Sequence, residues 1–328
     1  MAKVLVTGGA GYVGAHCCLA LSQAGHDVVV YDNLSNGHAA FAKWGRLERG
    51  DIRDRARLDA VIAAHRPDAV LHCAALIEVG VSVKDPSSFY DNNVAGALTV
   101  LDAMRDANVK AFVFSSTCAT YGAPQFLPMD ESHPQAPLNP YGWSKLMIEQ
   151  ASRDYAAAYG IRFAHLRYFN AAGAAPEHGV GERHDPESHA IPLALFTLIG
   201  RRAGFSIFGD DYDTRDGTAL RDYVHVLDLA DAHVRAIERL VGGGDSVAAN
   251  LGTGDGTTVK ELLAAIERVT GKAVPAAITP RRAGDSPALL ANNAYARAAL
   301  GWSPQRSLDD IVASAWRWHS EVEPKLFG

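Results

Sequence analysis

The chain has 328 residues, of which 48% are hydrophobic and 21% are charged, and its formal net charge is -6 at pH 7. This composition is typical of a globular protein with one large domain or two smaller ones. The negative charge argues against general nucleic-acid binding, which needs a basic face. We expect a cytoplasmic protein without membrane contact, because no apolar run approaches the ~18–20 residues that span a bilayer and no signal-peptide pattern precedes the first strand.

The sequence has four cysteines, none of which belongs to a CxxC pair: Cys17, Cys18, Cys73 and Cys118. No cluster of histidine and cysteine has the spacing of zinc ligands. We therefore expect buried thiols in a reducing compartment and no metal site.

The first half of the chain alternates short β-branched runs with helical patterns. Strands are predicted at residues 4–6, 28–31, 69–72, 110–115 and 162–167, and helices at residues 12–24, 55–64, 93–107 and 141–159. Such alternation is typical of right-handed βαβ units. The sequence therefore predicts an α/β fold with a doubly wound parallel sheet covered on both faces.

The second half has a different pattern. Residues 173–189 and 205–221 are polar or rich in glycine and proline, and we expect them to be long loops that close over a ligand. Helices are predicted again at residues 226–240, 259–270 and 308–321. We place a domain boundary near residue 170, with a cofactor domain at 1–170, a substrate domain at 171–328, and a return into the first domain around 223–252.

A glycine triplet follows the first predicted strand, with the spacing Gly8-x-x-Gly11-x-x-Gly14. The glycines permit a tight turn and a close approach of the backbone to a pyrophosphate, which the start of the next helix can then bind. The second strand ends at Asp32, whose carboxylate can accept bonds from ribose hydroxyls and would repel a 2′-phosphate. This pattern predicts NAD in preference to NADP.

Loops after the other strands of the sheet complete the predicted cofactor site, because ligands in such sheets lie beyond the carboxyl ends of the strands. Asp51 is expected near the adenine, and two small alanines after the fourth strand would let the cofactor lie close. The candidate cofactor contacts in these segments are Gly8, Gly11, Tyr12, Val13, Gly14, Asp32, Asn33, Leu34, Ser35, Asn36, Gly37, Asp51, Ile52, Cys73, Ala74, Ala75 and Leu76.

A tyrosine and a lysine four residues apart suggest acid/base chemistry. Tyr141 and Lys145 share one face near the start of a predicted helix. For a tyrosine to act as a base near neutral pH, its pKa of roughly 10 must fall by about 3 units, and a fixed ammonium together with a nicotinamide cation supplies a field of the right sign. Thr117, at the end of a strand, would hydrogen-bond the reacting hydroxyl.

Together these motifs resemble the extended short-chain dehydrogenase/reductase superfamily and, within it, the family of UDP-galactose 4-epimerases. The similarity runs from Lys3 to about Trp318. The segments that carry it are residues 7–14, 32–37, 89–94, 114–122, 140–145, 166–173, 207–212, 221–225 and 281–285.

The resemblance implies a 4-epimerase that interconverts UDP-galactose and UDP-glucose. A Tyr141 phenolate would take the O4 proton while the C4 hydride moves to NAD⁺, and the 4-keto sugar would turn over, while its UDP stays anchored, before the hydride returns. Tyr141 and Lys145 would also touch the cofactor, as would Asn92 and Phe169 on the nicotinamide side.

The resemblance also implies a substrate site and a homodimer. Asn170 would contact the diphosphate, and Arg221 and Arg282 would supply positive charge. The remaining candidate substrate contacts are Thr117, His189, Ala190, Ser206, Ile207, Phe208, Asp285 and Leu289. The helices at 93–107 and 141–159 have alanine-rich faces that could pair across a two-fold axis or only cover the sheet.

Three departures from the family pattern leave alternatives open. Ile77 replaces a lysine that often contacts the cofactor, His189-Ala190 replaces an asparagine and an apolar residue, and Leu289 has intermediate size at the position that governs acceptance of N-acetylated hexoses. A UDP-pentose or UDP-N-acetylglucosamine 4-epimerase therefore stays an alternative. A 4,6-dehydratase would need acidic residues after Thr117, where this chain has Cys118. A non-catalytic NAD-sensing module would need neither Tyr141 nor the arginines.

Overall fold

A seven-stranded, fully parallel sheet is the largest sheet of the computed structural model, which describes residues 1–282 and 286–328. The strand order is β11-β6-β5-β4-β1-β2-β3. The strands are β1 (Lys3–Thr7), β2 (Asp27–Asp32), β3 (Arg46–Arg49), β4 (Ala69–His72), β5 (Ala111–Thr117), β6 (Arg162–Tyr168) and β11 (Val247–Leu251). The order reverses between β1 and β4, and at such a point the loops beyond the strands diverge and leave room for a ligand. The predicted fold class is confirmed.

Helices cover both faces of this sheet, because the strand residues alternate between two apolar clusters. Val4 and Val6 face one cluster and Leu5 faces the other. The first face is covered by α1 (Tyr12–Gln23), α8 (Val226–Val241) and α10 (Ala294–Leu300), and the second by α2 (Arg55–His65), α5 (Gly96–Asp106) and α6 (Pro140–Tyr159).

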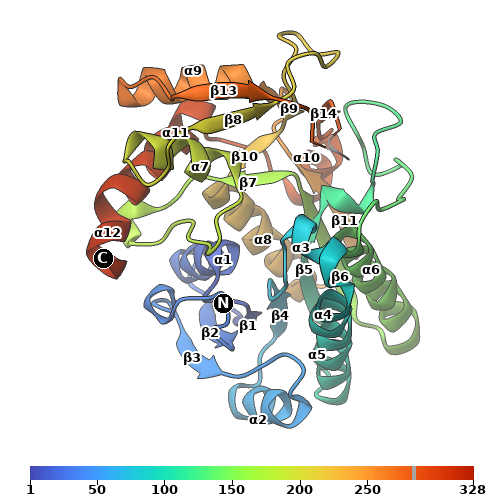
Figure 1. The fold of residues 1–328 in the computed structure, drawn as a ribbon. Coiled ribbons are helices and arrows are strands. Elements are labelled where there is room, and N and C mark those ends of the chain that lie inside the picture. Colours follow the sequence, from blue (N-terminus) through green and yellow to red (C-terminus); the bar gives the residue numbers. More distant parts are fainter. Residues whose placement is uncertain (283–285) are drawn as a thin grey trace.

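The second half builds a smaller core of its own, which Figure 1 shows at the end of the molecule away from α2 and α5. Its helices are α7 (Ala190–Leu198), α9 (Val259–Thr270) and α11 (Leu308–Arg317). Its paired strands are β8 (Phe205–Phe208) with β13 (Ala276–Thr279), β7 (Asn170–Ala172) with β10 (Tyr223–His225), and β9 (Leu220–Arg221) with β12 (Thr257–Thr258) and β14 (Ala288–Leu289).

Short elements join these parts. They are α3 (Val79–Lys84), α4 (Pro86–Phe89), α12 (Glu323–Phe327), the 3-10 turns Ala39–Phe41, Cys118–Thr120 and Pro176–His178, and the π-helical turns Tyr90–Ala95 and Trp318–Val322. Along the described residues, no helix combines the length and the apolar character that crossing a bilayer requires.

The chain does return to the sheet after the predicted boundary. β11 pairs in parallel with β6, with Val247 opposite Ala164. The expectation of a loop over residues 205–221 was wrong at its two ends, where β8 and β9 form. Phe205 and Ile207 are buried in the second core, and that burial of alternate residues favours a strand.

Candidate active site

The glycine loop after β1 lies directly against the loop after β4. Gly8 has a left-handed backbone (φ +72°), and a Cβ placed on it would lie 2.5 Å from the amide nitrogen of Ala74. A Cβ on Gly14 would lie 2.1 Å from the carbonyl oxygen of Gly8. Only glycine fits these positions, and the backbone is therefore bare at the strand-order reversal.

The first turn of α1 follows this loop and is suited to an anion. Its N-cap residue, Gly11, has no side chain, and no acidic residue stands in the first turn, which begins at Tyr12 and Val13. The N–H groups of a helix start point away from the helix and favour phosphate. The Tyr12 hydroxyl donates to the carbonyl oxygen of Gly173 at 2.6 Å and ties the loop to the chain after β7.

Asp32 closes the loop from the end of β2. Its Oδ2 accepts from the Ala10 N–H at 3.0 Å and its Oδ1 from the Leu34 N–H at 2.8 Å. Burial raises the pKa of Asp32, and these two donors oppose that shift. A Cβ on Gly37 would lie 2.8 Å from Oδ1, so the segment Asn33, Leu34, Ser35, Asn36 and Gly37 turns tightly around the carboxylate. A carboxylate at this place can accept bonds from a ribose diol and would repel a 2′-phosphate.

Asp51 is already engaged by a residue that the sequence patterns did not identify. Arg53 donates to both of its carboxylate oxygens, at 2.8 and 2.7 Å, and reaches Asp91 at 2.5 Å. Asn33 donates to Asp51 at 3.0 Å. The Arg53 hydrogen bonds hold the pKa of Asp51 well below its usual range. An adenine at this place would therefore meet a paired carboxylate, beside the buried side chain of Ile52.

A buried asparagine holds the loop after β4. The Asn93 Oδ1 accepts from the Leu76 N–H at 2.8 Å, and its Nδ2 donates to the Leu76 carbonyl and to the Ser144 hydroxyl, both at 3.0 Å. The Asn92 amide donates to Asn93 Oδ1 at 2.9 Å. Asn93 thus fixes the segment Cys73, Ala74, Ala75 and Leu76 against α6. Sequence reasoning missed it, because its signal, a fully buried amide, depends on tertiary contacts.

Tyr141, Lys145 and Thr117 meet where β5 ends and α6 begins. The N-cap Asn139 accepts from the Gly142 N–H and starts the helix, which places Tyr141 in the first turn and Lys145 one turn later. The Lys145 ammonium donates to the Ser115 carbonyl at 3.0 Å and lies 6.0 Å from the centroid of the Tyr141 ring. Lys145 is 3% exposed and Thr117 is 6% exposed.

Burial dominates the electrostatics of this group. It raises the pKa of Tyr141 to about 12, although a hydrogen bond with Thr117 acts in the opposite direction. It also lowers the pKa of Lys145 to about 8. Both shifts favour neutral side chains, so the protein alone does not provide the acidified phenol that a base requires. A further positive charge beside the ring is needed, and a nicotinamide cation has the right sign.

A buried ion pair supports the strand that carries Thr117. Glu149 on α6 accepts from the Ser116 hydroxyl at 2.7 Å and from the Arg167 guanidinium at 2.9 and 2.6 Å. Arg167 also donates to the Tyr121 hydroxyl at 2.8 Å. This network joins β5, β6 and α6, and it was not predicted, because its members are far apart in the sequence.

The candidate phosphate contacts lie on the second half of the chain. The Asn170 N–H donates to the Asp222 carbonyl at 3.0 Å, which pairs β7 with β10. The Arg221 guanidinium donates to the carbonyls of Leu220 and Ser286 at 2.9 and 3.0 Å. The expected ribose contact, Asp285, lies outside the described residues.

The strand β8 carries the three residues expected around a uracil. Ser206 is half-buried, Ile207 points into the second core and Phe208 is 41% exposed. The Arg282 guanidinium lies 5.1 Å from the centroid of the Phe208 ring. Because Ile207 faces the core, only its backbone can meet a base on the outer side.

The two positions with unusual residues have different surroundings. His189 is the N-cap residue of α7, ahead of Ala190, and its Nδ1 lies 2.7 Å from Glu182 Oε1 and 3.0 Å from Glu187 Oε1. Leu289 packs against a small apolar cluster that contains Phe169. Leu289 and Phe169 are thus brought together, whereas His189 faces two carboxylates.

Comparison with known proteins places this geometry in a family. The model of the NAD dependent epimerase/dehydratase family matches residues 4–252. A UDP-glucose 4-epimerase of Rhizobium meliloti (strain 1021) is 63% identical over 97% of both chains. The solved structure of a UDP-glucose 4-epimerase from Brucella ovis in complex with NAD has a TM-score of 0.94 and 48% identity, over 96% of this chain and 98% of that one. The corresponding structure from Bifidobacterium longum, in complex with NAD⁺ and UDP, has a TM-score of 0.92 and 39% identity, over 97% and 98%. This chain belongs to the NAD-dependent epimerase/dehydratase family.

Proposed function

We propose that the protein interconverts UDP-galactose and UDP-glucose by inverting C4 of the hexose, with NAD as a tightly held cofactor. The observation that carries the proposal is the meeting of Tyr141, Lys145 and Thr117 at the end of β5, beside the loop that Asn93 holds. The 63% identity to a protein named UDP-glucose 4-epimerase supports the substrate.

Each residue of this group has a distinct part in the proposed reaction. The Tyr141 oxygen takes the O4 proton and later returns it to O4 of the turned sugar, and the inversion at C4 comes from hydride return to the opposite face of the carbonyl. Thr117 donates or accepts a hydrogen bond that aligns the same hydroxyl. Lys145, anchored on the Ser115 carbonyl, keeps a positive charge near the phenol. NAD⁺, when bound, would accept the C4 hydride and return it. A general base contributes roughly 10²- to 10⁴-fold to the rate.

The parts of the chain that hold the two ligands differ. We propose that residues 1–170, with the return at 223–252, bind NAD through the glycine loop, Asp32 and the loop after β4. Residues 171–328 would bind the nucleotide sugar, with Asn170 at the boundary. Arg221 and Arg282 fit a diphosphate, because guanidinium groups bind phosphate oxygens in pairs. The site must bind UDP tightly and the hexose loosely, since the 4-keto sugar has to rotate between the two hydride transfers.

A single incubation tests this proposal. Purified protein is mixed with UDP-galactose without added NAD, and UDP-glucose is measured by chromatography. Formation of UDP-glucose until an equilibrium mixture is reached is the expected result. No UDP-glucose, with NAD found on the protein after denaturation, would point to a non-catalytic NAD-binding module. If no UDP-glucose forms and the protein binds no NAD even when NAD is added, both functions are refuted.

The intermediate size of Leu289 is compatible with a second class of substrate. Its side chain packs on the cluster that contains Phe169, so its size shapes the space next to the candidate nicotinamide contact. A UDP-N-acetylhexosamine or a UDP-pentose would be handled by the same chemistry. Turnover of UDP-N-acetylgalactosamine and a UDP-pentose, measured beside UDP-galactose, separates these substrates, and kcat/KM highest for UDP-galactose is expected.

We further propose that the protein acts as a cytoplasmic homodimer. Large apolar side chains are exposed on the two helices expected at a two-fold axis: Leu98 on α5 and Trp143 and Met147 on α6, at 36%, 42% and 42%. Exposed apolar side chains that lie together often mark an interface. Sedimentation equilibrium tests this: a dimer is expected, and Trp143→Glu should favour the monomer, whereas a wild-type monomer would contradict the proposal.

A further inference from the structure

Two glutamates and two histidines converge in the segment between β7 and α7. The sequence there reads Glu-x-His-x-x-Glu-x-His, and the residues are Glu182, His184, Glu187 and His189. One potential ligand atom of each lies within 4.8 Å of the others. Glu182 is 3% exposed, and the side chains of Glu187 and His184 are 4% and 15% exposed. The spacing rules used for Cys/His sites did not detect this cluster.

Three atoms in the cluster face one another without a hydrogen bond. Glu182 Oε1, His184 Nδ1 and Glu187 Oε2 are buried and have no hydrogen-bond partner. Glu182 Oε1 nevertheless lies 2.7 Å from His189 Nδ1 and 3.4 Å from His184 Nδ1, and Glu187 Oε2 lies 3.6 Å from His184 Nδ1. The atoms are therefore close but not aligned as donors and acceptors. Buried polar atoms without partners are costly, and a shared ligand removes that cost.

Some of the separations between these atoms are those of a small coordination sphere. Zinc bonds of about 2.0–2.2 Å in a tetrahedron place neighbouring ligand atoms ~3.3–3.6 Å apart. The separations of 3.4 and 3.6 Å from His184 Nδ1 fall in this range, and the separation of 2.7 Å between Glu182 Oε1 and His189 Nδ1 is shorter. Imidazole nitrogens and carboxylate oxygens are both ligands of divalent zinc. Two carboxylates and two neutral imidazoles around a divalent ion leave no net charge.

Neighbouring groups hold one carboxylate and the main chain in place. Glu187 Oε1 accepts from the N–H groups of Ser188 and His189, both at 2.8 Å. These bonds leave the other carboxylate oxygen, Oε2, for a metal ion. The Trp318 indole donates to the backbone carbonyl of Glu182 at 2.8 Å and fixes the main chain there, not the carboxylate. Such supporting bonds orient the ligands of metal sites.

We propose that Glu182, His184, Glu187 and His189 bind one divalent transition-metal ion of the Zn²⁺ class. The ion would anchor the segment that leads into α7. The ring of His184 also lies edge-on to Tyr12, with 6.1 Å between centroids, so the same site stiffens the contact with the glycine loop. The inference does not depend on the epimerase activity.

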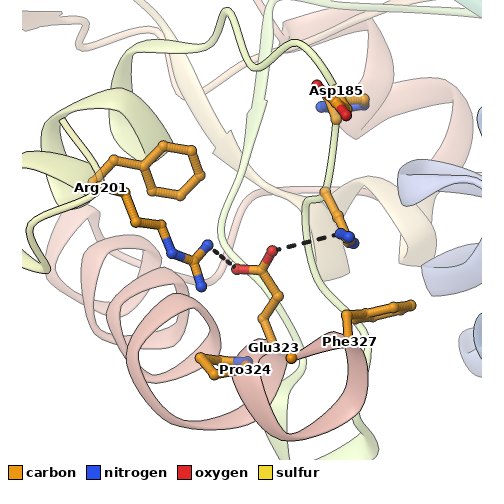
Figure 2. A pocket seen from close by; sticks show the side chains of 9 residues that line it. Asp185, Arg201, Glu323, Pro324 and Phe327 are labelled. Carbon is orange, nitrogen blue, oxygen red and sulfur yellow. Dashed lines mark hydrogen bonds and ion pairs between the residues drawn. The ribbon is translucent and has the colours of Figure 1, made fainter.

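A surface cavity lies next to one of the four residues. Its volume is ≈ 310 Å³, and His184 and Asp185 line it together with residues of α12. Figure 2 shows Glu323 of α12 among the lining residues, pointing toward Arg201, which donates to it at 2.8 Å. The cavity thus reaches the proposed site at His184, whereas Glu182, Glu187 and His189 do not line it.

Metal retention tests the proposal. Purified holoprotein is freed of metal with a chelator, dialysed against Zn²⁺ or Co²⁺, passed through a desalting column and analysed for metal per chain. The wild type should retain one ion per chain, and the Co²⁺ form should show the visible absorption of a four-coordinate N/O site. His184→Gln and Glu187→Gln should weaken binding at least ~10-fold. His178→Gln, a histidine of the same region outside the cluster, is the matched control and should bind as the wild type does.

Two results would overturn the proposal. One is a wild type that retains no stoichiometric metal and has the same melting temperature with Zn²⁺ and with chelator, because the cluster is then held by ion pairs between histidine and glutamate alone. The other is unchanged metal content in His184→Gln and Glu187→Gln, which would place the ion elsewhere. If the ligand variants fail to fold, the Co²⁺ absorption of the wild type still decides between a four-coordinate site and none.

Discussion

Replacing Gly8 by alanine should damage both the fold and NAD binding, and a second glycine provides the control. Gly8 and Gly25 both have left-handed backbones, with φ of +72° and +81°. An alanine there costs about 1–2 kcal/mol for the conformation alone. At Gly25 nothing lies within 4 Å of the new Cβ, whereas at Gly8 it would lie 2.5 Å from the nitrogen and 2.7 Å from the Cα of Ala74. The loop after β4 must shift, which adds a further ~1–3 kcal/mol.

Urea unfolding of the two variants measures the difference. Gly25→Ala should lose about 1–2 kcal/mol of unfolding free energy and keep its NAD, and Gly8→Ala should lose ~2–5 kcal/mol and most of its NAD. NAD is counted per chain after acid denaturation. Equal losses of stability, with NAD retained in Gly8→Ala, would refute the close packing of the two loops.

Three further substitutions test other parts of the structure. Glu149→Gln leaves the buried Arg167 guanidinium without its carboxylate and should cost about 3–5 kcal/mol in urea unfolding; a loss under ~1 kcal/mol would contradict the buried pair. His233 is fully buried, and burial lowers its pKa to about 4, so the unfolded chain binds more protons than the folded one below pH 6.5. As the pH falls from 6.5 to 4, the wild type should therefore lose up to about 3 kcal/mol of unfolding free energy relative to His233→Gln. Parallel pH profiles of the two proteins would contradict a neutral imidazole. Leu289→Ala should raise kcat/KM for UDP-N-acetylgalactosamine relative to UDP-galactose, and an unchanged ratio would place Leu289 away from the sugar.

Most of the sheet could be predicted from the sequence, because its strands are short buried apolar runs with helical patterns between them. The return predicted around residues 223–252 contains β11, which pairs with β6 in the sheet. The π-helical turn Tyr90–Ala95 was not, since a helical pattern does not distinguish 3.6 residues per turn from a wider turn. Strand β8 was assigned to a loop because the polar stretch behind it dominated the pattern.

The site could be predicted only where neighbours in sequence carry the signal. The spacing of Tyr141 and Lys145 and the glycine triplet are local patterns, and the structure brings them to the carboxyl ends of the strands. Asn93 and Glu149 act through partners that are 17 to 51 positions away, which a single sequence does not reveal. Arg53 is only two positions from Asp51, but no sequence pattern shows that the two side chains pair. The Arg53–Asp51 pair matters for the predicted cofactor site, because a paired carboxylate is less able to bind an adenine.

The central claim is that the Tyr141 oxygen moves the O4 proton of a UDP-hexose. The measurement that tests it most directly is the turnover of UDP-galactose by Tyr141→Phe, with bound NAD and UDP affinity measured on the same sample. We expect intact binding of both ligands and a kcat that is lower by ~10²- to 10⁴-fold. Turnover within about tenfold of the wild type, with both ligands bound, would contradict it, because another group would then have to move the proton.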